Sequence, residues 1–145
     1  MWQDEGSSYV ANSFDLQVVK SELETQGTLY FGVFSGEKII GFLKLCPKNS
    51  LPIFGNQNAF EIERVYLTRE SQGKGFGKSL MDFSIEIAKE MEKEIVWLKA
   101  VDSNKNAIRF YENLGFTPCG TSILELPNIK DEFRGIVVMR KNIRS

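Results

Sequence analysis

The sequence contains no histidine among its 145 residues. This absence excludes a Ser-His-Asp triad, a Cys-His pair and any zinc site that needs a histidine ligand. The two cysteines, Cys46 and Cys119, lie far apart and form no C-x-x-C motif, so we predict two reduced thiols rather than a disulfide. We therefore expect no metal site, and any catalysis must use carboxylates, tyrosine, lysine or cysteine.

The chain also lacks an excess of either charge and a long hydrophobic run. Its 18 basic and 19 acidic residues give a formal net charge of −1, so we expect no nucleic-acid partner. No apolar run approaches the roughly 18 residues that cross a membrane, and the first residues lack the basic and apolar regions of a signal peptide. With 42% hydrophobic residues, the chain is predicted to form one domain over residues 1–145, soluble and cytoplasmic.

Hydrophobic periodicity and turn residues divide the chain into alternating elements. The predicted helices cover residues 13–26, 76 to about 93, and 105–114, with Gly27 and Gly115 ending the first and third. The predicted strands cover residues 28–34, 38–46, 59–67, 95–100, 116–126 and 135–141. The first two strands should form a hairpin and the last two an antiparallel pair, with a loop at 47–58. The strand at 95–100 should run parallel to that at 59–67, because a crossover helix separates them.

The stretch FEIERVYLTRESQGKGFGK, residues 60–78, joins a strand through a glycine-rich loop to the start of a long helix. Gly73, Gly75 and Gly77 can adopt positive φ and let the backbone approach a ligand closely. The N–H groups and the positive dipole end of the helix favour negative charge. The stretch therefore predicts a pyrophosphate site, and a purely structural turn is the alternative.

Two better-known phosphate loops do not fit this stretch. A Walker A loop needs a glycine where Gln72 stands, and a dinucleotide fingerprint needs one where Lys78 or Leu80 stands. What remains is the pattern Q-x-x-G-x-G, from Gln72 to Gly77.

A second informative stretch is VDSNKNAIRFYENLGF, residues 101–116. Periodicity alone predicts one apolar helical stripe, which carries Ala107, Phe110, Tyr111 and Leu114. The string N-x-x-A-x-x-F-Y-E-x-L-G-F, which begins at Asn104, closely resembles the N-x-x-A-x-x-F-Y-x-x-x-G-F segment of the GNAT superfamily of N-acetyltransferases. The pattern from Gln72 to Gly77 resembles the (Arg/Gln)-x-x-Gly-x-(Gly/Ala) loop with which that superfamily binds the pyrophosphate of acetyl-CoA. The two motifs also occur in the order and at the spacing of the superfamily.

The resemblance covers nearly everything from Thr28 to Ile143. It implies an α/β (α+β), single-domain GNAT-like fold: a mixed, mostly antiparallel central sheet flanked by helices, with two central parallel strands splayed to admit acetyl-CoA. Segments such as EIERVYL and NAIRFYENLGF look most like the bacterial spermidine/spermine-type (PaiA-like) branch. The family normally begins with a strand and a helix for which this chain has little room, so we expect that part to be abbreviated or missing.

Transfer of an acetyl group to an amine needs a neutral amine, a stabilised oxyanion and a proton donor for the departing thiolate. Alkyl amines have a pKa near 10.4, so a base must remove a proton. Glu61 and Glu63 are candidates, because their spacing places both on one face of the predicted strand. Partly exposed surface acids are the alternative. The resemblance favours Glu61, since several family members carry a glutamate base at that position.

Tyr111 fits the role of proton donor, because a phenol and a thiol have pKa values of about 10 and 8.5. In the family, the equivalent tyrosine lies near the acetyl-CoA sulfur. A role in core packing alone is the alternative. Cys119 follows the helix of Tyr111 and has no histidine to activate it, so we expect it to be inert.

By resemblance, acetyl-CoA is the co-substrate and three segments bind it. The backbone around residues 65–67 should pair with the pantetheine arm like an added strand, and a β-bulge near residues 63–66 would open the gap. The loop at 72–78 should hold the pyrophosphate, with lysines adding charge. The predicted contacts are Val65, Tyr66, Leu67, Gln72, Gly73, Lys74, Gly75, Phe76, Gly77, Lys78 and Asn104.

The function implied is transfer of the acetyl group of acetyl-CoA directly to a primary amine, with a polyamine or another small amine as acceptor. A protein N-terminus or lysine side chain is an alternative acceptor, and the resemblance allows a homodimer. A non-catalytic acyl-CoA-binding or regulatory domain would keep the glycine loop but lose acid and base, which Tyr111 and Glu61 argue against. An interaction domain that binds no coenzyme would leave both motifs unexplained.

Overall fold

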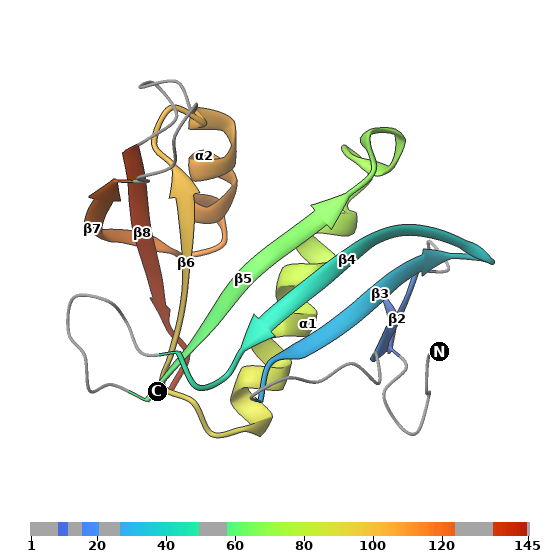
Figure 1. Ribbon diagram of the computed structural model, residues 1–145, viewed down its shortest axis with the longest axis horizontal. Coiled ribbons are helices and arrows are strands. Elements are labelled where there is room, and N and C mark those ends of the chain that lie inside the picture. The colour runs from blue at the N-terminus through green and yellow to red at the C-terminus, as the bar shows by residue number, and fades with distance from the viewer. Residues whose placement is uncertain (1–8, 12–15, 21–26, 50–57, 124–134, 145) are drawn as a thin grey trace.

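The computed structural model describes residues 9–11, 16–20, 27–49, 58–123 and 135–144. These residues form one eight-stranded sheet in the order β1-β2-β3-β4-β5-β6-β8-β7 (Figure 1). The strands are β1 (Tyr9–Ala11), β2 (Leu16–Lys20), β3 (Leu29–Ser35), β4 (Lys38–Cys46), β5 (Ala59–Leu67), β6 (Ile95–Val101), β7 (Thr117–Ile123) and β8 (Gly135–Asn142). The helices are η2 (Arg69–Ser71), α1 (Phe76–Glu90) and α2 (Lys105–Asn113). The fold is the predicted mixed and mostly antiparallel sheet with helices, and β5 and β6 form its parallel pair.

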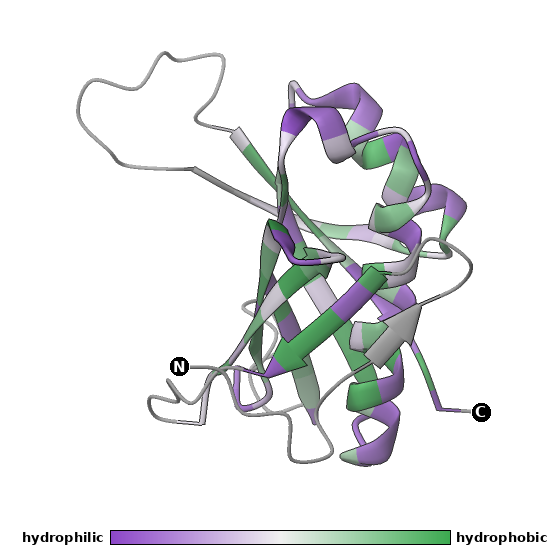
Figure 2. Cartoon of the chain, turned by 90° about the vertical axis from the view of Figure 1, so that its right-hand side faces the viewer, coloured by the Kyte–Doolittle hydropathy of each residue, from purple (hydrophilic) through white to green (hydrophobic). Residues whose placement is uncertain are grey.

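Both long helices pack against the same face of the sheet. The main hydrophobic cluster contains residues of α1 such as Leu80 and Phe83, and α2 packs Phe110 and Leu114 against it. Figure 2 shows that hydrophobic and hydrophilic residues alternate along the helices, as amphipathic helices on a sheet require. On the opposite face, which we call the open face, four residues of three strands form a smaller cluster: Ala59, Ile95, Trp97 and Val138.

The predicted helix over residues 13–26 is wrong where the structure describes it. Residues 16–20 form strand β2, which pairs antiparallel with β3 from Leu16↔Ser35 to Lys20↔Phe31. Leu16 and Val18 are fully buried and face the main cluster. Their spacing of two residues is that of one face of a strand, although the apolar residues of this segment also fit the spacing of a helix. Adjacent β-branched residues Val18 and Val19 favour the strand. Residues 13–15 and 21–26 of this prediction lie outside the described residues, as do residues 50–57 of the predicted loop and residues 124–126 of the predicted strand at 116–126.

The predicted hairpin of β3 and β4, the parallel β5–β6 pair and the antiparallel β7–β8 pair are confirmed. The parallel pairing is short and covers only Ala59↔Ile95, Phe60↔Val96 and Glu61↔Trp97. Beyond Glu61 the two strands diverge, as Figure 1 shows. The predicted splayed pair is therefore present, and it leaves the β6 side of β5 without a strand partner from residue 62 onward.

The predicted β-bulge lies at Glu63. Lys44 pairs with Arg64 and Leu45 pairs with Ile62, so Glu63 is the extra residue on β5. Phe60 and Ile62 face the main cluster before the bulge, and Val65 and Leu67 pack against the same cluster after it. The bulge thus shifts the alternation by one residue and keeps apolar side chains on the helix side along the whole strand.

The far end of β5 is fixed tightly to β4. The Thr68 N–H donates to the Ile40 carbonyl at 2.7 Å. Gly41 allows the two strands to approach so closely that a Cβ at this position would clash with the Tyr66 carbonyl oxygen. The strand end that leads into the glycine loop is therefore held in a fixed position.

Candidate functional site

The glycine loop between β5 and α1 uses positive φ at two of its three glycines. Gly73 has φ of 76° and Gly75 has φ of 84°, in the left-handed region that glycine tolerates without strain. Gly77 does not adopt positive φ, because it lies within the first turn of α1. A Cβ on Gly77 would lie 3.4 Å from the ring of Phe110, so glycine at this position keeps space between the two helices.

The N-terminus of α1 carries no side-chain cap, and its first turn contains no acidic residue. Gly75 is the N-cap, and the Ser79 N–H donates to its carbonyl at 3.2 Å. Gln72 Nε2 donates to the Leu67 carbonyl at 3.1 Å and ties the loop to the end of β5. Lys78 pairs with Asp82 at 3.1 Å on the exposed surface of the helix. An uncapped helix start with a basic rather than acidic first turn is suited to bind an anion.

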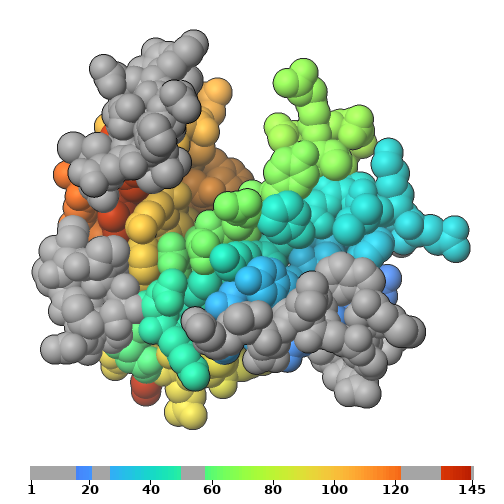
Figure 3. Space-filling model, viewed as in Figure 1, coloured from blue at the N-terminus to red at the C-terminus, as the bar shows by residue number. Residues whose placement is uncertain are grey.

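A cleft of about 550 Å³ opens at this helix start, between the end of β5 and α2. Figure 3 shows the hollow between the part of the molecule that contains α2 and the part that follows β5. Eight of the predicted coenzyme contacts line it: Val65, Leu67, Gln72, Gly73, Gly75, Gly77, Lys78 and Asn104. Strand, loop and helix residues that are far apart in sequence therefore meet at one cleft.

Three predicted contacts do not line the cleft. Tyr66 lies on the open face of the sheet and stacks on Phe42 with ring centroids 5.5 Å apart. Phe76 is buried in the main cluster, and Lys74 is exposed on the loop. The side chains of Tyr66 and Phe76 therefore lie away from the cleft.

Asn104 lines the cleft as the N-cap of α2. Its side-chain oxygen accepts a hydrogen bond from the Ala107 N–H at 3.1 Å. The carboxamide NH₂ group is the part of this side chain that keeps its donors for a ligand, since the oxygen is used by the cap.

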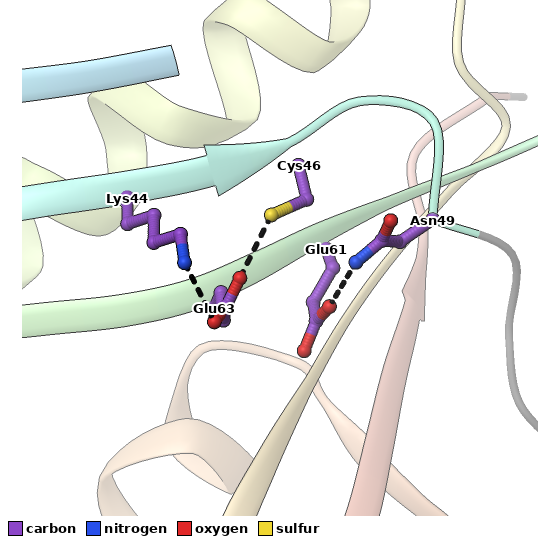
Figure 4. A network of polar contacts seen from close by, with 5 residues as sticks. All are labelled: Lys44, Cys46, Asn49, Glu61 and Glu63. Atoms are coloured by element: carbon purple, nitrogen blue, oxygen red, sulfur yellow. Dashed lines mark hydrogen bonds and ion pairs between the residues drawn. The ribbon is translucent and has the colours of Figure 1, made fainter. Parts of the chain in front are cut away.

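The two glutamates of β5 lie in a polar network on the open face (Figure 4). Asn49 Nδ2 donates to Glu61 Oε1 at 2.7 Å. The carboxylate of Glu63 accepts from Lys44 Nζ at 3.0 Å and from the Cys46 thiol at 2.9 Å. The prediction that both carboxylates share a face is confirmed, because oxygens of the two side chains and Cys46 Sγ all lie within 4.8 Å of one another.

The environments of the two carboxylates shift their pKa values in opposite directions. Burial raises the pKa of Glu61, and the nearby charge of Glu63 adds to this effect, against the hydrogen bond from Asn49. The hydrogen bond from Cys46 lowers the pKa of Glu63, and Lys44 lowers it further. Glu61 therefore keeps its proton to a higher pH than Glu63 does, and such a difference allows the two carboxylates to play different roles. Sequence spacing could not distinguish these roles, because the partners come from β4 and the following loop.

The cysteine in this network is not poised for reaction. Burial and the adjacent carboxylate of Glu63 raise the pKa of Cys46 to about 12, so the thiol stays protonated and donates to Glu63. Cys46 and Cys119 are both free, as predicted. Burial also raises the pKa of Cys119. Three potential metal ligands meet here, but a cation would have to displace the ammonium group of Lys44 and the thiol proton from Glu63.

Tyr111 packs its ring between Phe110 and Phe116, with centroid distances of 5.4 and 6.1 Å. Its side chain is half-buried against the main cluster, and burial raises its pKa. A phenol with a raised pKa keeps its proton at neutral pH and can donate it. The neighbouring Phe110 is the aromatic residue of α2 that lines the cleft.

Sequence reasoning missed several residues at both parts of the site. Asn106, Ala107 and Phe110 line the cleft, and the last two were assigned only to an apolar stripe. Trp97 Nε1 donates to the Asn49 carbonyl at 3.0 Å and so supports the loop that contacts Glu61. The quoted motif already contained Ala107 and Phe110, but no pattern in the sequence indicated Asn49 or Trp97.

The GNAT acetyltransferase family matches residues 1–116. The chain belongs to this family. A relative from Lactobacillus delbrueckii subsp. lactis, the uncharacterized N-acetyltransferase of the pepI 3' region, is 33% identical over 96 residues. That match covers 66% of this chain and 56% of the relative, so the chain aligns with only about half of the relative's length.

Solved structures share the GNAT fold with this chain. Nourseothricin acetyltransferase superposes with a TM-score of 0.69 at 21% identity, over 88% of this chain and 72% of that one. A GNAT acetyltransferase from Elizabethkingia anophelis with acetyl-CoA bound gives a TM-score of 0.67 at 15% identity, over 79% of this chain and 76% of that one. These likenesses show the fold. No helix among the described residues is long and apolar enough to cross a membrane.

Proposed function

We propose that this GNAT family member is an N-acetyltransferase that transfers the acetyl group of acetyl-CoA directly to a primary amine. One observation carries the proposal: Val65 and Leu67 of β5 line the cleft at the uncapped start of α1, and the same strand carries the carboxylate of Glu61 where its pairing with β6 ends. A coenzyme with its pyrophosphate at the glycine loop and its pantetheine arm along β5 would extend its thioester towards Glu61.

The residues of the cleft fit acetyl-CoA. The glycine loop and the uncapped helix start provide backbone N–H groups for the pyrophosphate, and Lys78 adds positive charge at the rim. Gly77 leaves open the space beside Phe110 that a side chain would fill. The β6 side of β5 has no strand partner at Val65 and Leu67, so its backbone can pair with the amide groups of the pantetheine arm. The proposed coenzyme-binding segment also includes the backbone of Tyr66, Gly73, Lys74 and Phe76.

The bound coenzyme would supply the thioester carbonyl that the amine attacks. Glu61 is the proposed base, because burial raises its pKa towards the range in which a base works efficiently. Asn49 holds its carboxylate in place at 2.7 Å. Glu63 stays ionised beside it as a fixed charge. Tyr111 is the proposed proton donor to the departing thiolate, and no covalent bond to the protein is needed.

The class of acceptor, the location and the assembly of the protein belong to the same proposal. The acceptor is a small amine, and a polyamine is the acceptor that the sequence resemblance suggests, with protein amines as the alternative class. Two free thiols agree with a reducing location such as the cytoplasm. A single domain and a homodimer both stay predictions.

The experiment is a coupled assay of free CoA release over a panel of small amines and peptides, together with calorimetric titration of acetyl-CoA. Amine-dependent release of CoA supports the proposal. Binding of acetyl-CoA without release by any amine would indicate a non-catalytic acyl-CoA-binding domain. The absence of binding would indicate an interaction domain.

A further inference from the structure

The open face of the sheet carries more positive than negative charge around the gap between β5 and β6. Glu61 and Glu63 are the acidic residues of β4, β5 and β6 on this face, and Lys44, Arg64 and Lys99 are the basic ones. Two carboxylates of these strands therefore share this face with three cations among the described residues.

The positions of these cations follow from the register. Trp97 lies opposite Glu61 and belongs to the open-face cluster, so Lys99, two residues further along β6, shares that face. Its ammonium group lies 5.8 Å from the centre of the Trp97 ring. Arg64 is the register partner of Lys44, whose side chain also points to the open face. Arg64 and Lys99 are thus on the two strands that diverge, one on each side of the gap.

Lys44 forms an ion pair with Glu63, whereas Arg64 and Lys99 act on the carboxylates of Glu63 and Glu61 only at longer range. Within the described part of the chain, neither Arg64 nor Lys99 has an ion-pair partner. Both side chains are exposed. Lys99 is close enough to Glu61 to counteract the rise of its pKa. A step of two residues along a strand is about 7 Å, so an amine held at Glu61 would lie about that far from the ammonium group of Lys99.

We propose that the acceptor is a small amine that also carries a carboxylate, held with its amine at Glu61 and its carboxylate between Lys99 and Arg64. This inference rests on the proposed acetyltransferase activity and names its substrate class. A polyamine, the acceptor that the sequence resemblance suggests, would bring a second positive charge to the same cations and would be repelled, so the charges of the open face argue against it. An amine with a neutral tail would gain nothing from them.

Three four-carbon amines test the inference: 4-aminobutanoate, butylamine and 1,4-diaminobutane. All three have a primary amine with a pKa near that of lysine, about 10.4, so their tails differ mainly in charge. The measurement is kcat/KM for CoA release at saturating acetyl-CoA. We expect 4-aminobutanoate to be best and 1,4-diaminobutane worst, with roughly tenfold or more between them.

Lys99→Glu should reduce the ratio of kcat/KM for 4-aminobutanoate to that for 1,4-diaminobutane by about tenfold or more. Lys38→Glu, on the exposed β3–β4 hairpin, makes the same change in net charge and should leave the ratio unchanged. A preference of the wild type for 1,4-diaminobutane would overturn the inference, as would an equal loss with all three amines in Lys99→Glu. If the wild type prefers 1,4-diaminobutane, its release of CoA with that amine would still support the proposed acetyltransferase activity. Failure to bind acetyl-CoA in calorimetry would overturn that activity itself.

Discussion

Replacing Glu61 by glutamine separates the proposed base from its surroundings. The side chain is only 6% exposed, and its oxygen accepts a hydrogen bond from Asn49 at 2.7 Å. A glutamine oxygen can accept the same bond, so the variant should fold normally and bind acetyl-CoA as the wild type does. General base catalysis contributes about 10²- to 10⁴-fold, or roughly 2.7 to 5.4 kcal/mol of transition-state stabilisation. We expect kcat/KM to fall by a factor in this range.

The pH dependence gives the sharper readout. In the wild type, kcat/KM should rise as Glu61 loses its proton, at a pH above the ordinary range of glutamate because burial raises its pKa. In Glu61→Gln this rise should disappear, and activity should instead follow the free amine towards a pH of about 10. The assay is CoA release under initial-rate conditions between about pH 5 and 10, with acetyl-CoA affinity measured by calorimetry.

Glu63→Gln is the matched control, since it makes the same chemical change two residues away. Removing the charge of Glu63 takes away one cause of the raised pKa of Glu61, so the rise in activity should move to lower pH. The maximal kcat/KM should change less than in Glu61→Gln. A larger loss in Glu63→Gln would transfer the role of base to Glu63, and unchanged activity in both variants would refute a carboxylate base on β5.

Three further substitutions test other parts of the site. Gly75→Val places a β-branched residue at φ of 84° and should weaken acetyl-CoA binding at least tenfold in calorimetry, and unchanged affinity in a folded variant would remove the proposed role of the loop. Tyr111→Phe should lower kcat by about 10²-fold at unchanged acetyl-CoA affinity, whereas near-normal turnover with chemistry rate-limiting would leave Tyr111 as a packing residue. Cys46→Ala removes the donor at 2.9 Å from Glu63 and should cost about 1–3 kcal/mol of unfolding free energy at pH 7, measured by urea denaturation. Because that hydrogen bond lowers the pKa of Glu63, its contribution should be lost as pH falls through this lowered pKa, and Cys46→Ser, which keeps a donor, should recover most of it.

The sequence was informative where one local pattern decides the structure. The hairpin of β3 and β4 and the glycine loop before α1 were predicted from turn residues and periodicity, and the structure contains them. The segment at 16–20 was misassigned because its apolar residues satisfy both periods over so short a length, and only pairing with β3 decides in favour of the strand. Local patterns carry no information about such a long-range partner.

The candidate site divides in the same way. Val65, Gly75 and Asn104 were predicted within motifs, and the fold brings them to one cleft. The difference between Glu61 and Glu63 could not be predicted, because it depends on burial and on donors such as Asn49 that reach them from another segment. Spacing in a strand indicates which face a side chain occupies, but the three-dimensional surroundings determine its pKa.

The single extra residue at Glu63 reverses which side chains of β5, odd-numbered or even-numbered, face each side of the sheet. Upstream of it, odd-numbered residues such as Glu61 face the open side; downstream, the odd-numbered Val65 and Leu67 face the helices and line the cleft. Without the insertion, Arg64 and Tyr66 would take their places, and a guanidinium group would stand where the apolar wall now lies. One strand can thus carry the proposed base on its open side and an apolar edge along the cleft, because its alternation changes between the two.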